Sequence, residues 1–163
     1  MAKSSAGILM YRYADGELQV LLVHPGGPYW RAKDEGAWSI PKGEYDPDED
    51  PLAAAIREFQ EETGAVPCGD FIALLPIKQP DGKTVTAFAV QGDFDPSSLR
   101  SNTFTIEWPP RSGRMQEFPE VDRAQWFSIA EAERRLLKGQ IPLLWQLAEA
   151  VRKSPRHRST TDD

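Results

Sequence analysis

Cysteine and histidine are scarce in this chain of 163 residues, which contains one cysteine, Cys68, and two histidines, His24 and His157. These three residues cannot supply an internal disulfide or a zinc site of the usual four-ligand Cys and His type. Long apolar runs are also missing. No stretch approaches the roughly 18 residues that a membrane-spanning helix needs, and the first residues lack a signal-peptide core. The sequence therefore excludes disulfide-stapled and zinc-finger scaffolds, and we expect a cytoplasmic protein without a membrane partner.

Two common glycine-rich phosphate motifs, GxxxxGK[ST] and GxGxxG, do not occur either, which disfavours P-loop and dinucleotide-binding folds. The composition is otherwise that of a folded protein, with 40% apolar and 27% charged residues. The length suits a single domain. We expect residues 1–152 to form this domain and the polar residues 153–163 to be a mobile tail with no role in nucleic-acid binding.

Negative charge is concentrated in one segment of the chain. Residues 43–62 contain eight Asp and Glu residues and one basic residue, Arg57, while the net charge of the whole chain is −6. The remainder of the chain therefore sums to +1. A local acidic block on a nearly neutral body calls for a local explanation rather than a general one such as solubility.

The apolar pattern predicts strands on both sides of this acidic segment, which itself reads as a helix from the N-cap residue Asp50 to Thr63, ending at Gly64. Asp-Gly pairs between alternating runs mark hairpins. The predicted strands are 6–12 and 18–24 around Asp15-Gly16, a short strand 37–40, 71–78 and 84–90 around Asp81-Gly82, 104–108, and a last strand ending at 126–127. Two further helices are predicted at 130–137 and 143–151.

The acidic helix has two distinct faces. At about 100° per residue, one face is apolar and the adjacent face gathers three carboxylates, those of Glu58, Glu61 and Glu62. Like charges about 5 Å apart repel by roughly 3 kcal/mol per pair at an effective dielectric near 20, and Arg57 is the one basic residue of the segment. The pattern therefore predicts a bound cation. Oxygen ligands favour a hard divalent ion, Mg²⁺ or Mn²⁺.

The segment Gly43 to Ala65, GEYDPDEDPLAAAIREFQEETGA, resembles the Nudix box GX5EX7REUXEEXGU of the Nudix hydrolase family. Ala65 departs from the pattern, because a larger aliphatic residue is usual at its position. The resemblance implies the Nudix fold, an α/β class with a mixed β-sheet in an α/β/α sandwich. It also implies hydrolysis of a phosphoanhydride in a nucleoside diphosphate linked to another group. Metal ligands implied by the resemblance are Glu58, Glu61, Glu62 and the Gly43 carbonyl, while Arg57 would pair with Glu49 and Gly64 would end the helix.

The sequence leaves open which glutamate is the general base. In the Nudix family it is a glutamate of the box or of a loop before a late strand, and here Glu120, Glu117 and Glu58 compete. We favour Glu120 because it stands six residues before Trp126. Glu58, Glu61 and Glu120 are thus the candidate catalytic groups.

The lead-in Trp38 to Gly43, WSIPKG, is similar to that of Nudix enzymes acting on dinucleoside polyphosphates and diphosphoinositol polyphosphates, whereas other segments look like a small bacterial subgroup of predicted NTP pyrophosphohydrolases. An NTP or a dinucleoside polyphosphate is therefore the expected substrate. Candidate substrate-binding residues are Lys42, Arg31, Trp108, Arg111 and Arg114, with Tyr29, Trp30 and Phe118 as further aromatics. A catalytically silent Nudix domain that senses a nucleotide is the alternative. The sequence leaves open the choice between Mg²⁺ and Mn²⁺ and the existence of a homodimer.

Overall fold

The computed structural model describes residues 4–153, so the expected mobile tail falls, except for Lys153, outside the described residues. The helices are α1 (Pro51–Thr63), α2 (Ile129–Arg135) and α3 (Ile141–Arg152), with short 3₁₀ turns η1 (Pro96–Ser98) and η2 (Lys138–Gln140). In the described part of the chain, no helix is long and apolar enough to cross a membrane.

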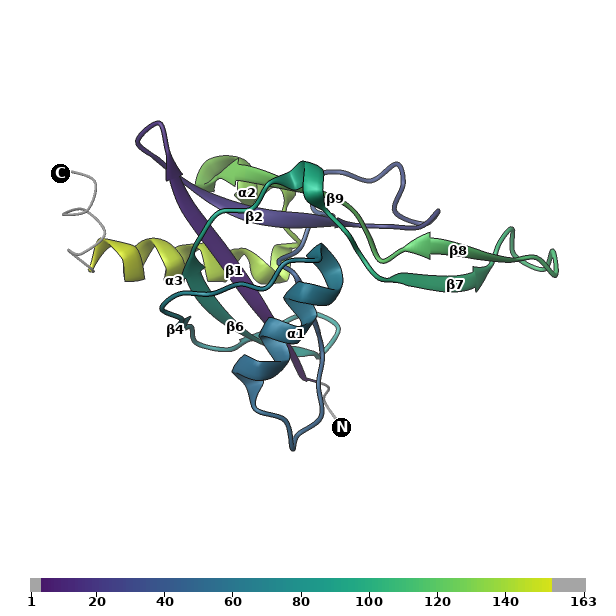
Figure 1. Ribbon diagram of the computed structural model, residues 1–163, viewed down its shortest axis with the longest axis horizontal. Coiled ribbons are helices and arrows are strands. Elements are labelled where there is room, and N and C mark those ends of the chain that lie inside the picture. Colours follow the sequence, from purple (N-terminus) through teal and green to yellow (C-terminus); the bar gives the residue numbers. More distant parts are fainter. Residues whose placement is uncertain (1–3, 154–163) are drawn as a thin grey trace.

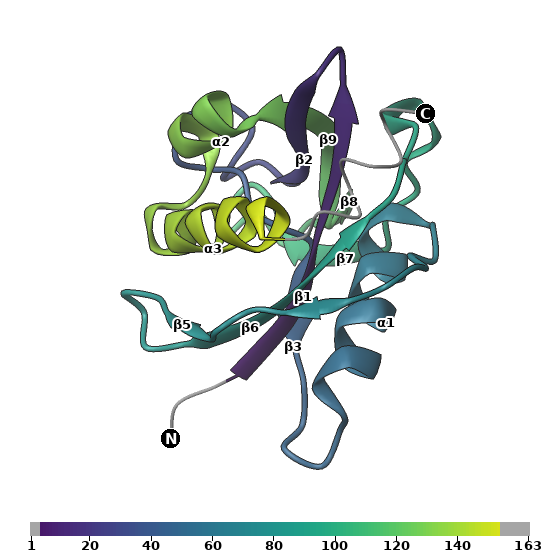
Figure 2. The same ribbon diagram turned by 90° about the vertical axis from the view of Figure 1, so that its left-hand side faces the viewer.

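Seven strands form one mixed sheet: β1 (Ser4–Ala14), β2 (Glu17–Pro25), β3 (Lys42–Glu44), β4 (Ile72–Ala73), β5 (Ile77–Lys78), β6 (Thr84–Gln91) and β9 (Val121–Ser128). Along its main path the order is β4-β6-β1-β2-β9, while β3 pairs with β1 and β5 with β6. The β1–β6 pair is parallel, and the other pairs are antiparallel. Figure 1 and Figure 2 show α1 on one face of this sheet and α2 with α3 on the other.

Alternation along β1 explains why both faces are covered. Leu9 and Tyr11 belong to the core beneath α2 and α3, whereas Ile8 and Met10 belong to the core beneath α1. Because neighbouring side chains of a strand point to opposite faces, a strand buried on both sides needs a layer of helix on each. The expected α/β/α sandwich with a mixed sheet is confirmed.

The hairpin and the acidic helix form where the sequence predicts them. Asp15 and Gly16 both have positive φ, 54° and 76°, as the tight turn between β1 and β2 requires. Asp50 caps α1 by accepting a hydrogen bond from the Ala53 amide at 3.0 Å. Gly64, with φ 87°, ends the helix.

A second, two-stranded sheet projects from the body as an arm, consisting of β7 (Thr103–Glu107), β8 (Met115–Pro119) and the tip between them (Figure 1). The sequence predicts β7 but not its partner β8. The polar residues of β8 are mostly exposed, so the strand lacks the buried alternation that would reveal it.

Two predicted strands differ from the structure. The segment 37–40 makes single β-bridges, Val23 with Ser39 and Trp38 with Leu136, and the regular strand begins only after Pro41, at Lys42. The segment 71–78 is divided into β4 and β5, because Pro76 has no amide hydrogen to donate. Between them the backbone of Leu75 exchanges two hydrogen bonds with the Gln146 side chain of α3, at 2.6 and 3.0 Å.

Candidate active site

The site is built where β3 passes the C-terminal half of α1. β3 pairs with the start of β1, where Gly7 lies opposite Lys42. A Cβ on Gly7 would come within 2.7 Å of both the Lys42 Cβ and the Pro41 carbonyl oxygen, so this close approach requires glycine. The pairing fixes Lys42 and Gly43 beside the helix.

Gly43 makes room for the first carboxylate of the helix. A Cβ at Gly43 would overlap the Glu58 carboxylate, which lies directly against the Gly43 backbone. On the opposite side of α1, Ala55 and Phe59 are fully buried against the sheet and hold the helix in this orientation. With its apolar face packed on the sheet, α1 has its acidic face toward the end of β3.

Arg57 contacts several carboxylates of the acidic face. Its guanidinium is ion-paired with Glu49 from the loop before the helix, lies 3.1 Å from a Glu58 oxygen, and lies 3.7 Å from a Glu61 oxygen. Glu49 also accepts a hydrogen bond from the Asp46 amide at 3.1 Å. Arg57 therefore joins the loop to the helix and supplies a positive charge to two of the three predicted metal ligands.

Glu62 and Lys42 line the same cavity. Burial, together with the charges of Glu58 and Glu120, raises the pKa of the Glu62 carboxyl to about 8 against the lowering effect of Lys42. The Lys42 backbone amide also lowers the pKa of this carboxyl, as the weakest of these effects. Burial likewise lowers the pKa of the Lys42 ammonium, and Glu62 opposes that change. Glu62 and Lys42 are a partly buried acid and base whose charges act on each other.

Glu120 joins this group from a segment that is distant in the sequence. It precedes β9, and burial followed by the charge of Glu61 raises its pKa. The pKa of Glu58 is raised by burial, by Glu61 and by Glu120, with Arg57 acting in the opposite direction. Glu117 instead accepts a hydrogen bond from the Thr103 hydroxyl at 2.8 Å, within the arm. Of the two loop glutamates, the structure brings Glu120 to the α1 carboxylates.

The sequence predicts that the three α1 carboxylates converge on one point, and in the structure they do not. Among residues 4–153, no group of three or more His, Cys, Asp or Glu side chains is arranged so that it could hold a metal ion. The physical reason is that the chain supplies its own counter-charges, with Arg57 beside Glu58 and Glu61 and with Lys42 beside Glu62. The donor chemistry still suits a hard cation, because carboxylates with raised pKa values remain short of positive charge.

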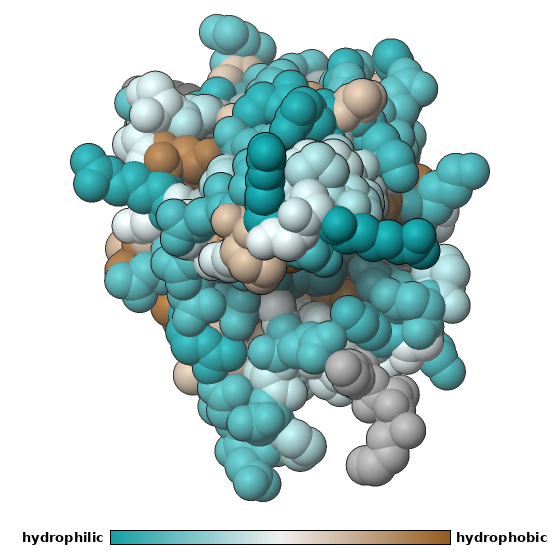
Figure 3. Space-filling model, turned by 90° about the vertical axis from the view of Figure 1, so that its right-hand side faces the viewer, coloured by the Kyte–Doolittle hydropathy of each residue, from teal (hydrophilic) through white to brown (hydrophobic). Residues whose placement is uncertain are grey.

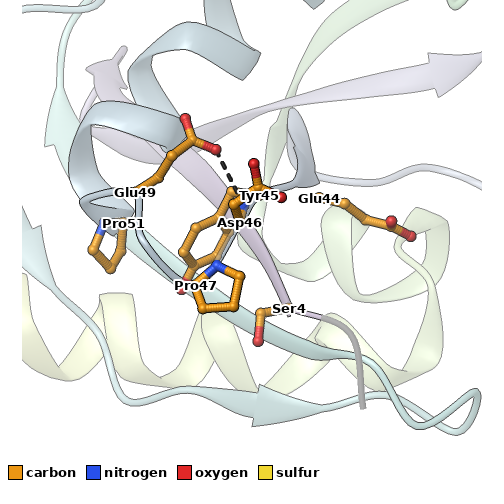
Figure 4. Close-up of a pocket in the computed structure, with 7 residues that line it drawn as sticks. All are labelled: Ser4, Glu44, Tyr45, Asp46, Pro47, Glu49 and Pro51. Atoms are coloured by element: carbon orange, nitrogen blue, oxygen red, sulfur yellow. Dashed lines mark hydrogen bonds between the residues drawn. The ribbon is translucent and has the colours of Figure 1, made fainter. Parts of the chain in front are cut away.

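A cavity of about 190 Å³ opens beside Glu62, Lys42 and Glu120. Its remaining wall is largely apolar and is lined by Val23, Pro25, Trp30, Ala37, Ser39, Ile40, Val121 and Leu137. The cavity thus combines three charged side chains with a largely apolar lining. A larger hollow of about 380 Å³ lies on the outer side of the loop before α1, where Figure 4 shows Glu49 bonded to the Asp46 amide.

The candidate substrate-binding residues fall into two places. Lys42 lines the cavity, but Arg31, Trp108, Arg111 and Arg114 are not among the residues that line it. Arg31 is in the loop of residues 26–37, which leads from β2 to the Trp38 bridge, and the other three are at the tip of the arm. Tyr29 and Trp108 connect the two, with ring centroids 5.2 Å apart. Phe118 is in β8, next to Phe104 of β7.

Gln140 is a positioning residue that the sequence analysis missed. Its side chain is fully buried, accepts a hydrogen bond from the Ile40 amide at 3.1 Å and donates to the Ser39 hydroxyl at 3.0 Å. It also donates to Gln79 at 3.1 Å. This network fixes the segment that leads to Lys42. A single glutamine before a helix gives no signal of such a role in the sequence.

A family model for the NUDIX domain matches residues 1–147, and the chain belongs to this family. Among curated relatives, it is 39% identical over 62 residues to the asymmetrical bis(5'-nucleosyl)-tetraphosphatase of Caenorhabditis elegans, a match that covers 38% of this chain and 41% of that protein. It is 39% identical over 74 residues to the RNA pyrophosphohydrolase of Erythrobacter litoralis, covering 42% and 43% of the two chains. These matches span less than half of either relative.

Solved structures share the fold at lower identity. The NUDIX domain of Shewanella oneidensis NrtR, in complex with ADP ribose, superposes with a TM-score of 0.63 at 18% identity over 93% of this chain and 89% of that chain. A C. elegans Ap4A hydrolase binary complex gives a TM-score of 0.59 at 20% identity, covering 92% and 98%. At these identities the likeness extends to the fold alone.

Proposed function

We propose that the protein is a divalent-metal-dependent Nudix hydrolase that cleaves a phosphoanhydride bond in an NTP or a dinucleoside polyphosphate. The observation that carries this proposal is a set of four acidic side chains close enough to act on one another's pKa values. Glu62 and Glu120 line one cavity, while the charge of Glu58 raises the pKa of Glu62 and the charge of Glu61 raises those of Glu58 and Glu120. Similarity to a tetraphosphatase and to an RNA pyrophosphohydrolase supports the same class of reaction.

Glu58, Glu61 and Glu62, with the Gly43 carbonyl, are the groups that would hold Mg²⁺ or Mn²⁺. Bound there, a divalent ion would offset charge on the phosphate oxygens and activate a water molecule. Glu58 and Glu61 would then share their negative charge between the ion and Arg57. Arg57 and Glu49 keep the helix and the preceding loop in register, and Lys42 offers an ammonium to a substrate phosphate.

We assign the general base to Glu120, in preference to Glu117 and Glu58. Glu120 lines the cavity and has a raised pKa, which makes its carboxylate a better proton acceptor near neutral pH. Glu58 is paired with Arg57, and Glu117 is bonded within the arm. Glu120→Gln should lower kcat by about 10² because an effective general base contributes at least that much. A reduction below about threefold would reject the assignment.

A substrate panel tests the proposal. Nucleoside triphosphates, dinucleoside polyphosphates, sugar nucleotides and diphosphoinositol phosphates are incubated with Mg²⁺ or Mn²⁺ in ¹⁸O-labelled water, and the products are identified by mass. We expect cleavage of a phosphoanhydride with one labelled oxygen in a product. Binding of a nucleotide without any product would instead support the alternative, a silent domain that senses its ligand.

A further inference from the structure

Ion pairing divides the ten arginines of residues 4–153 into two groups. Six lie within 4 Å of a carboxylate oxygen: Arg12, Arg57, Arg123, Arg134, Arg135 and Arg152. The other four, Arg31, Arg100, Arg111 and Arg114, form no ion pair within the described part of the chain, and all are exposed. All four belong to the 26–37 loop or to the arm and the residues leading into it. Within residues 4–153, the arginines without an ion pair are therefore confined to one region.

The acidic residues of the loop form ion pairs with α2, and those of the arm accept hydrogen bonds. In the loop, Asp34 pairs with Arg135 and Glu35 with Arg134, both from α2. In the arm, Glu107 accepts a hydrogen bond from the Gly113 amide at 2.8 Å, and Glu117 accepts one from Thr103. Among the described residues, the loop thus keeps Arg31 without an ion-pair partner, and the arm keeps Arg111 and Arg114 without one, although Glu107 and Glu117 remain charged because their donors are neutral. Exposed guanidinium groups without an ion-pair partner favour an anionic ligand.

An aromatic pair joins the loop to the arm at this surface. Tyr29, which is 60% exposed, meets the Trp108 ring edge to face at a centroid distance of 5.2 Å. Guanidinium groups form paired hydrogen bonds with phosphate oxygens, and aromatic rings stack with nucleobases. In Figure 3 this side of the molecule faces the viewer, and hydrophilic side chains cover most of it.

The backbone at the tip gives a second indication. Arg111 has φ 62°, a left-handed conformation in which glycine or asparagine is normally favoured over a long side chain. A strained residue at an exposed tip has no packing to justify it. An arginine retained in this conformation is consistent with a ligand contact that needs its guanidinium.

The arm also sets the size of the ligand. Its base is next to the cavity, because the Glu120 amide donates to the Asn102 carbonyl at 2.8 Å just before β7. Five strand residues at roughly 3.4 Å each place the tip about 17 Å farther out. A ligand that contacts both Glu120 and the tip must therefore be elongated.

We propose that the arm and the 26–37 loop bind the distal nucleotide unit of an elongated substrate, a base with its phosphate that lies beyond the anhydride to be cleaved. This inference rests on the proposed function for the position of the reacting end. In this inference, long substrates are selected over short ones by Arg31, Trp108, Arg111 and Arg114. These residues do not bind the phosphates of the anhydride that is cleaved. The distal unit belongs either to a dinucleoside polyphosphate or to the second nucleotide of a 5'-triphosphorylated RNA.

The test compares binding of long and short ligands without turnover. Calorimetry in EDTA gives Kd values for diadenosine tetraphosphate, for a 5'-triphosphorylated tetraribonucleotide and for ATP. The test variant combines Arg111→Gly, which suits the φ of that position, with Arg114→Gln. A control variant, Arg152→Gln with Lys153→Gln, removes the same charge at the end of α3. Circular dichroism verifies that both are folded.

We expect the wild type to prefer at least one long ligand to ATP, and the arm variant to lower that preference about tenfold, since charge-assisted hydrogen bonds contribute at least this much when lost. The preference should also weaken with added salt. The two long ligands identify the source of the distal unit. Absence of a preference in the wild type, or an equal loss in the control variant, would overturn the inference. Hydrolysis is measured separately, so a lowered preference without any cleavage would reject the proposed function and keep the binding surface.

Discussion

The buried carboxyl of Glu62 should make the metal-free protein less stable as the pH rises. Its pKa is about 8 in the folded chain against an ordinary value of 4.5. Below pH 4.5 the carboxyl is protonated in both folded and unfolded states, so it has no effect. Between pH 4.5 and 8 the unfolded chain releases this proton and the folded chain retains it, which favours unfolding.

The magnitude follows from the difference between the two pKa values. At about 1.4 kcal/mol for each tenfold change, the metal-free protein should lose roughly 2–4 kcal/mol of unfolding free energy over this range. The raised pKa values of Glu58 and Glu120 act in the same direction. Carboxyls with lowered pKa values, such as Glu49, lose their contribution only as the pH falls below their ordinary value, outside the range considered.

Urea unfolding in EDTA, followed by tryptophan fluorescence from pH 5 to 8.5, measures the effect. Glu62→Gln should remove most of the pH dependence and be more stable than the wild type at pH 8, whereas Glu17→Gln, at an exposed strand end, should resemble the wild type. Divalent metal should restore the stability of the wild type at pH 8 more than that of Glu62→Gln. A wild type whose stability increases from pH 5 to 8, or a Glu62→Gln variant with the same slope, would refute the reasoning.

Three further substitutions test the construction of the site. Gly43→Ala should displace the Glu58 carboxylate, because the added Cβ overlaps it. It should lower kcat and lower the free energy of unfolding in urea by about 1–3 kcal/mol, and unchanged kinetics would contradict this geometry. Glu49→Gln should lower the free energy of unfolding by about 1 kcal/mol or less, since the pair of Glu49 with Arg57 is partly exposed. It should nevertheless reduce turnover, because the loop is no longer tied to α1. Equal turnover in the variant and the wild type would count against that role. Gln140→Leu should destabilise the fold by about 1–3 kcal/mol because the buried Ile40 amide loses its acceptor, and an unaltered unfolding curve would exclude this contribution.

Local signals in the sequence account for much of the fold. The Asp15-Gly16 turn, the Asp50 cap and the Gly64 end of α1 depend on neighbouring residues only, and each forms as expected. The displaced strand at Lys42 and the unpredicted β8 depend on pairing with distant segments. Such partners are not encoded in local periodicity.

The site shows the same division. Helical spacing places Glu58, Glu61 and Glu62 on one side of α1, because it follows from the geometry of the helix. It does not reveal that the charge of Lys42 would act on Glu62. The Arg57 contacts are local to α1, where Glu61 is four residues along the helix, whereas Lys42 is placed by the pairing of β3 with β1 and could be found only from the three-dimensional structure.

Turnover by Glu61→Gln tests the central claim most directly, that the acidic face of α1 carries out a metal-dependent hydrolysis. The variant, the wild type and Glu17→Gln are assayed on the best substrate of the panel, with Mg²⁺ titrated from absence to saturation. The account predicts activity that requires the metal and falls by about 10² or more in Glu61→Gln, with Glu17→Gln like the wild type. Full activity of Glu61→Gln, or hydrolysis that persists in EDTA, would contradict it.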